Sequence, residues 1–259
     1  MSGSGLVHLK IEQQVATVVF DRPEARNAMT WSMYDRFAEI CAELNAHEQV
    51  RVTVLRGAGD KAFVAGTDIQ QFQHFESGQD GVNYEEIIDA RIHLLESLRM
   101  PTIAVVQGYA IGGGLAMATA CDFRLATPNA RFGVPIARTV GNCLSVANVS
   151  RLLAAFGLPR TKRMLLLAEM LEADEALQCG YVHSIVEPEQ LEQTLSALCG
   201  RLVGHAPLTM QASKETMRRL LVEQLPDGED LIRLCYGSAD FKIGMQAFVD
   251  KQTPQWSGV

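Results

Sequence analysis

Positive charge, paired cysteines and clustered metal ligands are all scarce in this 259-residue sequence. Lys and Arg number 23 against 30 Asp and Glu, which gives a formal net charge of −7. An acidic chain repels the phosphate backbone, so we do not expect a nucleic-acid-binding protein. The six cysteines form no Cys-x-x-Cys pair, and the His, Cys and carboxylate residues show no metal-ligand spacing. We therefore expect reduced thiols and no metal site.

Charged residues are also missing between positions 101 and 121, a stretch long enough to span a membrane. The stretch opens with Pro101 and carries Gly108 and the glycine run 112–114 near its middle. These residues favour a buried strand, a glycine turn and a buried helix over a membrane span. The first residues contain no basic segment followed by an apolar one, so we expect no signal peptide and a cytoplasmic location.

The rest of the composition, 47% hydrophobic and 20% charged, is that of a folded globular protein. Strand-length apolar runs alternate with helical periodicity until about Ser145, and from there the pattern is helical throughout. This order predicts an α/β core followed by a helical C-terminal section. The expected strands are Leu6–Ile11, Val15–Phe20, Val52–Arg56, Phe63–Ala65, Thr102–Val106 and Phe123–Ala126. The expected helices include one capped by Thr30 and those at Ile87–Leu98, Leu115–Cys121, Val146–Phe156, Thr161–Leu167, Asp174–Cys179, Leu191–Val203, Leu208–Val222 and Ala239–Val249.

Two segments share a strand that runs into small residues and then into a helix. They are residues 63–69, FVAGTDI, and residues 105–115, VVQGYAIGGGL. Each turn can present an unpaired backbone N–H at the start of a helix, where the helix dipole favours negative charge. Two such donors aimed at one point would form an oxyanion hole. Glycines in such turns can equally serve close packing of a helix on a strand, so both interpretations stay open.

Together with other segments, these two resemble the crotonase family, also called enoyl-CoA hydratase/isomerase. The further matching segments are DRPEARNAM at 21–29, Ala62, GYAIGGG at 108–114, Cys121-Asp122, GMQAF at 244–248 and Asp250-Lys251. The resemblance implies a spiral of repeated ββα units in residues 1–200 and a helical trimerisation section in residues 201–259. It also implies a coenzyme A thioester as substrate, no separate cofactor, and a homotrimer or a dimer of trimers.

The resemblance also implies roles for nine residues. By position, the backbone N–H groups of Thr67 and Gly113 would bind the thioester oxygen and stabilise an enolate. A second group would hold the nucleotide and pantetheine of coenzyme A, and it comprises Ala25, Arg26, Ala65, Asp68, Ile69, Phe248 and Lys251. In this family, the positions of Phe248 and Lys251 often come from a neighbouring subunit.

The two glutamates that typical hydratases of the family use as acid and base are absent. The position two residues beyond the triple glycine is Ala116. The position after the Phe-Gly-x-Pro segment is Ile136 or Ala137. Neither alanine nor isoleucine can transfer a proton, which puts ordinary hydration in doubt but leaves thioester binding unaffected.

Two segments could supply replacement groups. Cys143 follows Gly141-Asn142, where the dehalogenase branch of the family carries a nucleophilic aspartate. Its thiol could be a nucleophile or a small buried side chain, and Arg138 and Asn142 are further polar candidates nearby. The segment after Asp68 offers His74, Tyr84, Glu85 and Glu86, each of which could instead lie on an exposed face.

We therefore expect an acyl-CoA enzyme, most simply an enoyl-CoA hydratase/isomerase-like lyase that works through a thioester enolate. One alternative is a different reaction on the same scaffold, such as decarboxylation, thioester hydrolysis, isomerisation or dehalogenation. The other is a catalytically silent protein that binds acyl-CoA.

Overall fold

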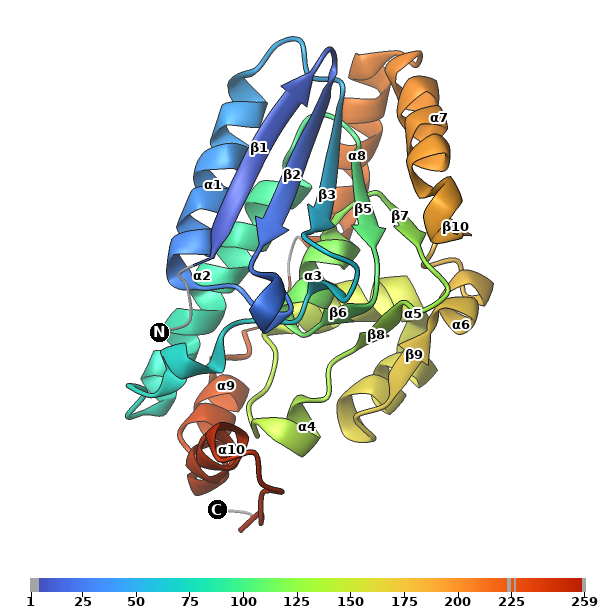
Figure 1. The fold of residues 1–259 in the computed structure, drawn as a ribbon. Coiled ribbons are helices and arrows are strands. Elements are labelled where there is room, and N and C mark those ends of the chain that lie inside the picture. The colour runs from blue at the N-terminus through green and yellow to red at the C-terminus, as the bar shows by residue number, and fades with distance from the viewer. Residues whose placement is uncertain (1–4, 223–224, 226, 258–259) are drawn as a thin grey trace.

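The structure is a computed structural model that describes residues 5–222, 225 and 227–257 (Figure 1). Its strands form a six-stranded sheet and a four-stranded sheet. The larger sheet has, in spatial order, β1 (Leu6–Glu12), β2 (Val15–Asp21), β3 (Val52–Gly57), β5 (Thr102–Val106), β7 (Phe123–Ala126) and β10 (Ser184–Ile185). The smaller sheet has β4 (Ala62–Val64), β6 (Tyr109–Ile111), β8 (Arg131–Gly133) and β9 (Met170–Glu172).

The larger sheet begins with the predicted hairpin. β1 and β2 are antiparallel, and Gln13 turns the chain between them with a φ of 53°. Ala16, Val18 and Phe20 alternate along β2 and are fully buried. The remaining neighbours in this sheet are parallel, and β3 and β5 are buried on both faces, as expected for strands between two helical layers.

Helices cover both faces of the larger sheet. The core on one face is shared with α1 (Trp31–Ala46), α2 (Gly78–Glu96) and α3 (Gly113–Ala120). The other face packs against α7 (Leu191–Val203), which contributes Leu191, Leu195, Leu198 and Leu202 to a separate apolar cluster. The predicted cap of α1 is confirmed, because the Thr30 side chain accepts a hydrogen bond from the Met33 N–H.

The chain repeats one unit three times. A strand of the larger sheet is followed by a strand of the smaller sheet and then by a helix: β3-β4-α2, β5-β6-α3 and β7-β8-α5. This confirms the predicted α/β spiral of ββα units. α5 spans Val146–Leu166 and breaks at Gly157, whose φ is 70°, so it corresponds to the two helices predicted in this region. Short connections precede the first and third helices, namely the 3-10 helix η2 (Ile69–Phe72) and α4 (Ile136–Thr139).

The prediction of helix throughout from Ser145 is wrong. β9 and β10 lie in this region, beside α6 (Ala173–Gln178), and each adds an edge strand to one of the sheets. β6 and β8 were also not predicted. All four strands have two or three residues, which is too short for alternating burial to show in the sequence.

The C-terminal section contains α8 (Pro207–Val222), α9 (Glu229–Tyr236) and α10 (Ala239–Val249). α8 packs against α5, whereas α9 lies along α2, and α10 contacts η2 and α4 (Figure 1). The predicted division between residues 200 and 201 falls inside α7 and stays a prediction. None of the described helices combines the length and the apolar character that a membrane crossing needs.

α9 was not predicted, and it brings one side chain into the centre of the molecule. Tyr236, at its last residue, is 1% exposed and packs directly on Gly81 of α2. A Cβ at residue 81 would lie 2.2 Å from the Tyr236 ring, so only glycine permits this approach. The C-terminal section is thereby docked on the helix of the first unit, β3-β4-α2.

Candidate active site

A cavity of about 740 Å³ lies between the core and α10. Its lining includes all nine residues for which the sequence predicted a role: Ala25, Arg26, Ala65, Thr67, Asp68, Ile69, Gly113, Phe248 and Lys251. These residues come from the end of the 3-10 helix η1 (Pro23–Ala25) and the residue after it, the turn from β4 into η2, the start of α3, and the end of α10 with the segment that follows it. The structure thus gathers residues that are more than 200 positions apart in the sequence around one space, and their individual roles stay predictions.

Thr67 offers an unpaired N–H to this cavity because of the way the chain leaves β4. The Met29 N–H donates to the Gly66 carbonyl at 2.8 Å, and the Asp68 N–H donates to the Met29 carbonyl at 2.9 Å. The two hydrogen bonds engage the Gly66 carbonyl and the Asp68 N–H, which flank Thr67 in the chain. The Thr67 N–H itself has no hydrogen-bond acceptor within the described part of the chain. The helix expected after Thr67 is only the 3-10 helix η2, so the helix-dipole argument does not apply at this donor.

The glycine run has a separate function at each of its residues. Gly112 has a φ of 54° and turns the chain out of β6, and Gly114 packs so closely on β4 that a Cβ would lie 1.9 Å from the Val64 carbonyl oxygen. Gly113 lies between them as the first residue of α3, where the N–H has no partner inside the helix. The packing interpretation is therefore correct for Gly114, whereas Gly113 presents an unpaired N–H whose part in an oxyanion hole stays a prediction.

Two tyrosines hold the Thr67 side chain. Its Oγ1 hydrogen-bonds with the Tyr34 hydroxyl at 2.8 Å and the Tyr84 hydroxyl at 2.7 Å. Burial raises the pKa of both phenols above their usual range, so both stay neutral at ordinary pH. Through these bonds α1 and α2 fix the turn that presents the Thr67 N–H.

Positive charge gathers at the outer end of the cavity. Arg26, in the left-handed conformation after η1, places its guanidinium 5.3 Å from the centre of the Tyr109 ring. It also lines a shallow neighbouring pocket together with Lys61 and Arg131. Phe248 and Lys251 of this same chain line the cavity, and a contribution of these positions from a neighbouring subunit stays a prediction.

Asp68 is already engaged within the chain. Its carboxylate forms an ion pair with the buried Arg22 at 2.8 Å and accepts a hydrogen bond from the Gln70 N–H at 3.0 Å. The carboxylate therefore stabilises the turn after Thr67, and any contact with a ligand would add to that.

The residues at the positions of the two missing glutamates lie in different surroundings, and none of them can act as an acid or a base. Ala116 is buried within α3. Ile136 begins α4 and lines the cavity, whereas Ala137 is exposed and lines a different pocket beside α10.

Glu85 is the replacement candidate that the structure favours. It projects from α2, is 3% exposed and lines the cavity. Its Oε2 accepts a hydrogen bond from the Ser145 N–H at 3.0 Å, and its Oε1 accepts one from the Tyr236 hydroxyl at 2.8 Å. The Asn142 side-chain amide in turn donates to the Tyr236 oxygen at 2.9 Å. Burial outweighs these two donors and raises the pKa of Glu85 to about 8.

The other candidates divide into residues that line the cavity and residues that do not. His74, Glu86 and Arg138 are exposed, and none of them lines it. Tyr84 and Asn142 do line it. Tyr236 is not among the residues predicted from the sequence, although Ile232 and Tyr236 form an apolar i, i+4 pair between Gly228 and Gly237 that could have indicated a short buried helix.

Cys143 points away from the cavity. Its thiol donates to the Leu231 carbonyl of α9 at 3.5 Å and also hydrogen-bonds with Cys235. The hydrogen bond between the two free thiols raises the pKa of Cys143 far above its usual range and lowers the pKa of Cys235 to about 7. A nucleophilic thiolate at Cys143 is therefore disfavoured.

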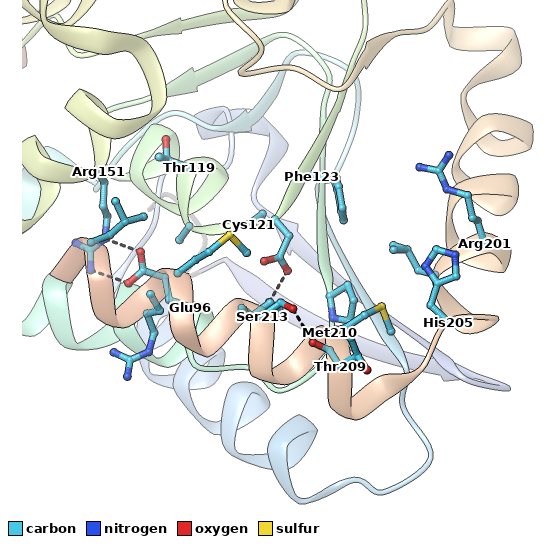
Figure 2. Close-up of a pocket in the computed structure, with 18 residues that line it drawn as sticks. Glu96, Thr119, Cys121, Phe123, Arg151, Arg201, His205, Thr209, Met210 and Ser213 are labelled. Carbon is cyan, nitrogen blue, oxygen red and sulfur yellow. Dashed lines mark hydrogen bonds and ion pairs between the residues drawn. The ribbon is translucent and has the colours of Figure 1, made fainter. Parts of the chain in front are cut away.

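A second cavity of about 780 Å³ lies beneath α8 (Figure 2). Figure 2 shows Glu96 and Arg151 at one end of it, and Arg201 and His205 at the other. Arg151 and Glu96 are joined by hydrogen bonds of 2.7 and 2.9 Å, and Lys214 is paired with Asp122. Because none of the predicted site residues lines it and much of its charge is paired, we place the chemistry in the first cavity.

Comparison with known proteins agrees with the predicted family. A model of the enoyl-CoA hydratase/isomerase family matches residues 10–259. A short-chain-enoyl-CoA hydratase of Clostridium acetobutylicum is 32% identical over 255 residues, with 95% of each chain covered. A crystal structure of an enoyl-CoA hydratase/carnithine racemase from Magnetospirillum magneticum has a TM-score of 0.80 at 28% identity and covers 98% of this chain and 96% of that one. Methylmalonyl-CoA decarboxylase complexed with 2S-carboxypropyl CoA has a TM-score of 0.88 at 25% identity, with 98% of each chain covered. The crotonase-type fold is thereby confirmed, and the names of these similar proteins cover more than one reaction.

Proposed function

The chain belongs to the enoyl-CoA hydratase/isomerase family, and on that premise we propose that it is an acyl-CoA enzyme that holds a thioester enolate on two backbone N–H groups. The donors would be those of Thr67 and Gly113. The observation that carries the proposal is that both N–H groups lack an acceptor within the described chain while both residues line one cavity. A thioester carbonyl oxygen is an acceptor that would satisfy both.

The chemistry follows from where negative charge develops. When an electron pair arrives at Cα of the thioester, charge moves to the carbonyl oxygen, and two fixed donors stabilise it there. Removing one such donor typically lowers the rate by about two to three orders of magnitude. The hydrogen bonds from Tyr34 and Tyr84 to Thr67 keep its donor in place before the substrate arrives.

The remaining lining residues orient the substrate. The acyl group would extend toward Tyr84, Glu85 and Asn142. The coenzyme A part of the bound thioester would extend out of the cavity along Arg26 and Lys251. In a chain of net charge −7, these two cations supply the local positive charge that phosphate groups need.

We also propose that the chain is a cytoplasmic homotrimer or dimer of trimers. Large apolar side chains project into solvent from α5, α8 and α9, including Leu166 at 73%, Leu220 at 80% and Leu234 at 70% exposure. Large exposed apolar side chains are candidates for burial against a protein partner. Sedimentation at several protein concentrations tests this, because a monomeric mass throughout would contradict it.

The activity is tested by loss of deuterium from propionyl-CoA that carries two deuterons at Cα. In ordinary water, an enzyme that forms the enolate replaces these deuterons with protons, and mass spectrometry of the thioester follows the loss. We expect catalysed loss together with saturable binding. Binding without loss, on esters of several chain lengths, would favour the silent binding protein.

Hydration is tested in parallel with crotonyl-CoA. The similarity to hydratases favours a gain of one water, whereas the absence of both usual glutamates argues against it. A product heavier by one water at a catalytic rate would assign hydration to this chain despite Ala116 and Ile136.

A further inference from the structure

We propose that Glu85 is the group that moves the proton to and from Cα of the bound thioester, in place of the two glutamates that this chain lacks. This assignment rests on the proposed function, because a proton can be returned to Cα only if an enolate forms. It gives one side chain the roles of acid and base in the two directions of the same step.

The position of Glu85 is the first argument. Three carboxylates line the cavity among the described residues: Glu24, Asp68 and Glu85. Glu24 is exposed at the outer end, and Asp68 is paired with Arg22. Glu85 alone is buried without a cationic partner, and it lies on the lining shared with Thr67 and Gly113. A proton-transfer group needs this exclusion from water together with access to the substrate.

The carboxyl group of Glu85 is also held in a fixed orientation. The Ser145 N–H bonds one oxygen and the Tyr236 hydroxyl bonds the other, so α9 and the start of α5 clamp the group from two sides. Asn142 extends this arrangement, and its amide oxygen is buried without a hydrogen-bond partner. Since Asn142 also lines the cavity, that oxygen is an acceptor that a donor on the ligand can satisfy.

The surroundings of Glu85 keep it protonated at neutral pH. The titratable groups that face it are Tyr34 of α1, Tyr84 and Asp89 of α2, Cys143 before α5, and Tyr236 of α9. The three phenols and the thiol have raised pKa values and carry no charge. Asp89 raises the pKa of Glu85, and its own charge is partly balanced by Arg151 of α5 at 3.4 Å. Glu85 is therefore an acid below a pH of about 8 and a base above it.

A resting acid suits enolates that form without removal of a proton. Loss of carbon dioxide from a 2-carboxyacyl-CoA is such a reaction, because the electron pair of the broken carbon–carbon bond enters the enolate. The Glu85 proton then goes to Cα, and the resulting carboxylate regains a proton from water. Hydration also needs a base for the attacking water, and the described lining offers no second buried carboxyl group.

The test compares Glu85→Gln with wild type in the deuterium-loss assay. Glutamine keeps the shape of the side chain, can accept from the Ser145 N–H and can donate to the Tyr236 oxygen, but it cannot carry the proton. We expect deuterium loss to fall by about 10²- to 10⁴-fold, with the Kd for propionyl-CoA unchanged. Glu86→Gln is the matched control, because Glu86 is the next residue and is exposed. We expect it to behave as wild type.

The pH profile separates a proton carrier from a structural side chain. Removal of a deuteron needs ionised Glu85, so the wild-type rate should rise with pH and level off above about 8. Residual activity in Glu85→Gln should lack this rise. Deuterium loss that survives in Glu85→Gln with an unchanged profile overturns the assignment alone. The absence of any loss in wild type overturns the proposed function, and the assignment with it.

Discussion

The two ends of the catalytic cavity are built in different ways. At the end where we propose that the thioester binds, the proposed functional groups are backbone N–H groups, fixed by a bridge between Met29 and Thr67 and by the first turn of α3. At the proposed acyl end the proposed functional group is the Glu85 side chain, fixed by residues from α9 and from the start of α5. Backbone donors survive almost any substitution, whereas a side-chain acid can be lost at one position and supplied from another. An enolate site built from backbone donors, as we propose, can therefore persist in a chain that lacks both usual glutamates.

The largest effect we expect is on stability at the acyl end. The pKa of Glu85 lies near 8 in the folded chain and near 4.5 when exposed, so between these values the folded state holds a proton that the unfolded state has lost. The contribution of Glu85 to the free energy of unfolding should therefore be fully present below pH 4.5. It should fall by about 1.4 kcal/mol per pH unit between pH 4.5 and about 8. Urea unfolding of wild type and Glu85→Gln at a fixed protein concentration measures this difference. Parallel pH dependences for the two proteins would contradict a buried, protonated Glu85.

The next effect concerns a donor at the thioester end. Proline fits the first position of a helix and has no N–H, so Gly113→Pro removes the donor while α3 can still form. We expect deuterium loss from the thioester to fall by about 10²- to 10³-fold. Gly113→Ala is the matched control, because it keeps the N–H and places a Cβ 3.1 Å from the Tyr34 hydroxyl. Equal losses in the two variants would show that space, rather than the donor, matters at this position.

Tyr236→Phe tests whether the hydroxyl that α9 supplies tunes the proposed proton transfer by Glu85. Its hydroxyl donates to Glu85 and lowers the pKa of that carboxyl, so its removal should move the rise in deuterium loss to higher pH. A shift of about one pH unit would lower the rate at pH 8 by about fivefold, and by about tenfold well below pH 8, with recovery at higher pH. A lower rate at every pH with an unshifted profile would assign Tyr236 a purely structural role.

A smaller effect is expected at the outer end of the cavity. Lys251→Glu should weaken binding of propionyl-CoA more than binding of propionyl-pantetheine, because only the former carries the nucleotide phosphates. Lys242→Glu, an exposed change in α10 outside the cavity lining, is the control for net charge. Calorimetry measures all three proteins, and equal weakening of both esters by Lys251→Glu would contradict the contact.

The smallest effect is expected at Cys143. The thiol points to Leu231 and Cys235 rather than into the cavity, so Cys143→Ser should leave deuterium loss unchanged. Intact-protein mass spectrometry during turnover should likewise show no adduct on the wild-type protein. An acyl group found on Cys143 would restore the nucleophile hypothesis.

The same contrast explains what the sequence could predict. Thr67 and Gly113 lie in local segments whose residue types and spacing are recognisable, and most strands and helices of the core follow their hydrophobic periodicity. The edge strands β9 and β10 could not be found this way, because two or three residues define no period.

Glu85 could only be proposed as one of several polar residues after Asp68. What separates it from His74 and Glu86 is its position beneath α9, and the Tyr236 hydroxyl that contacts it lies 151 residues further along the chain. Packing of α9 on α2 depends on Gly81. No local sequence pattern indicates which distant helix packs against that glycine.

A crystal structure of the chain with bound propionyl-CoA tests the central claim most directly. The account predicts the thioester oxygen at about 3 Å from the backbone nitrogens of both Thr67 and Gly113, with Cα facing Glu85. A thioester bound elsewhere, for example in the cavity beneath α8, or one whose carbonyl oxygen contacts neither nitrogen, would contradict it.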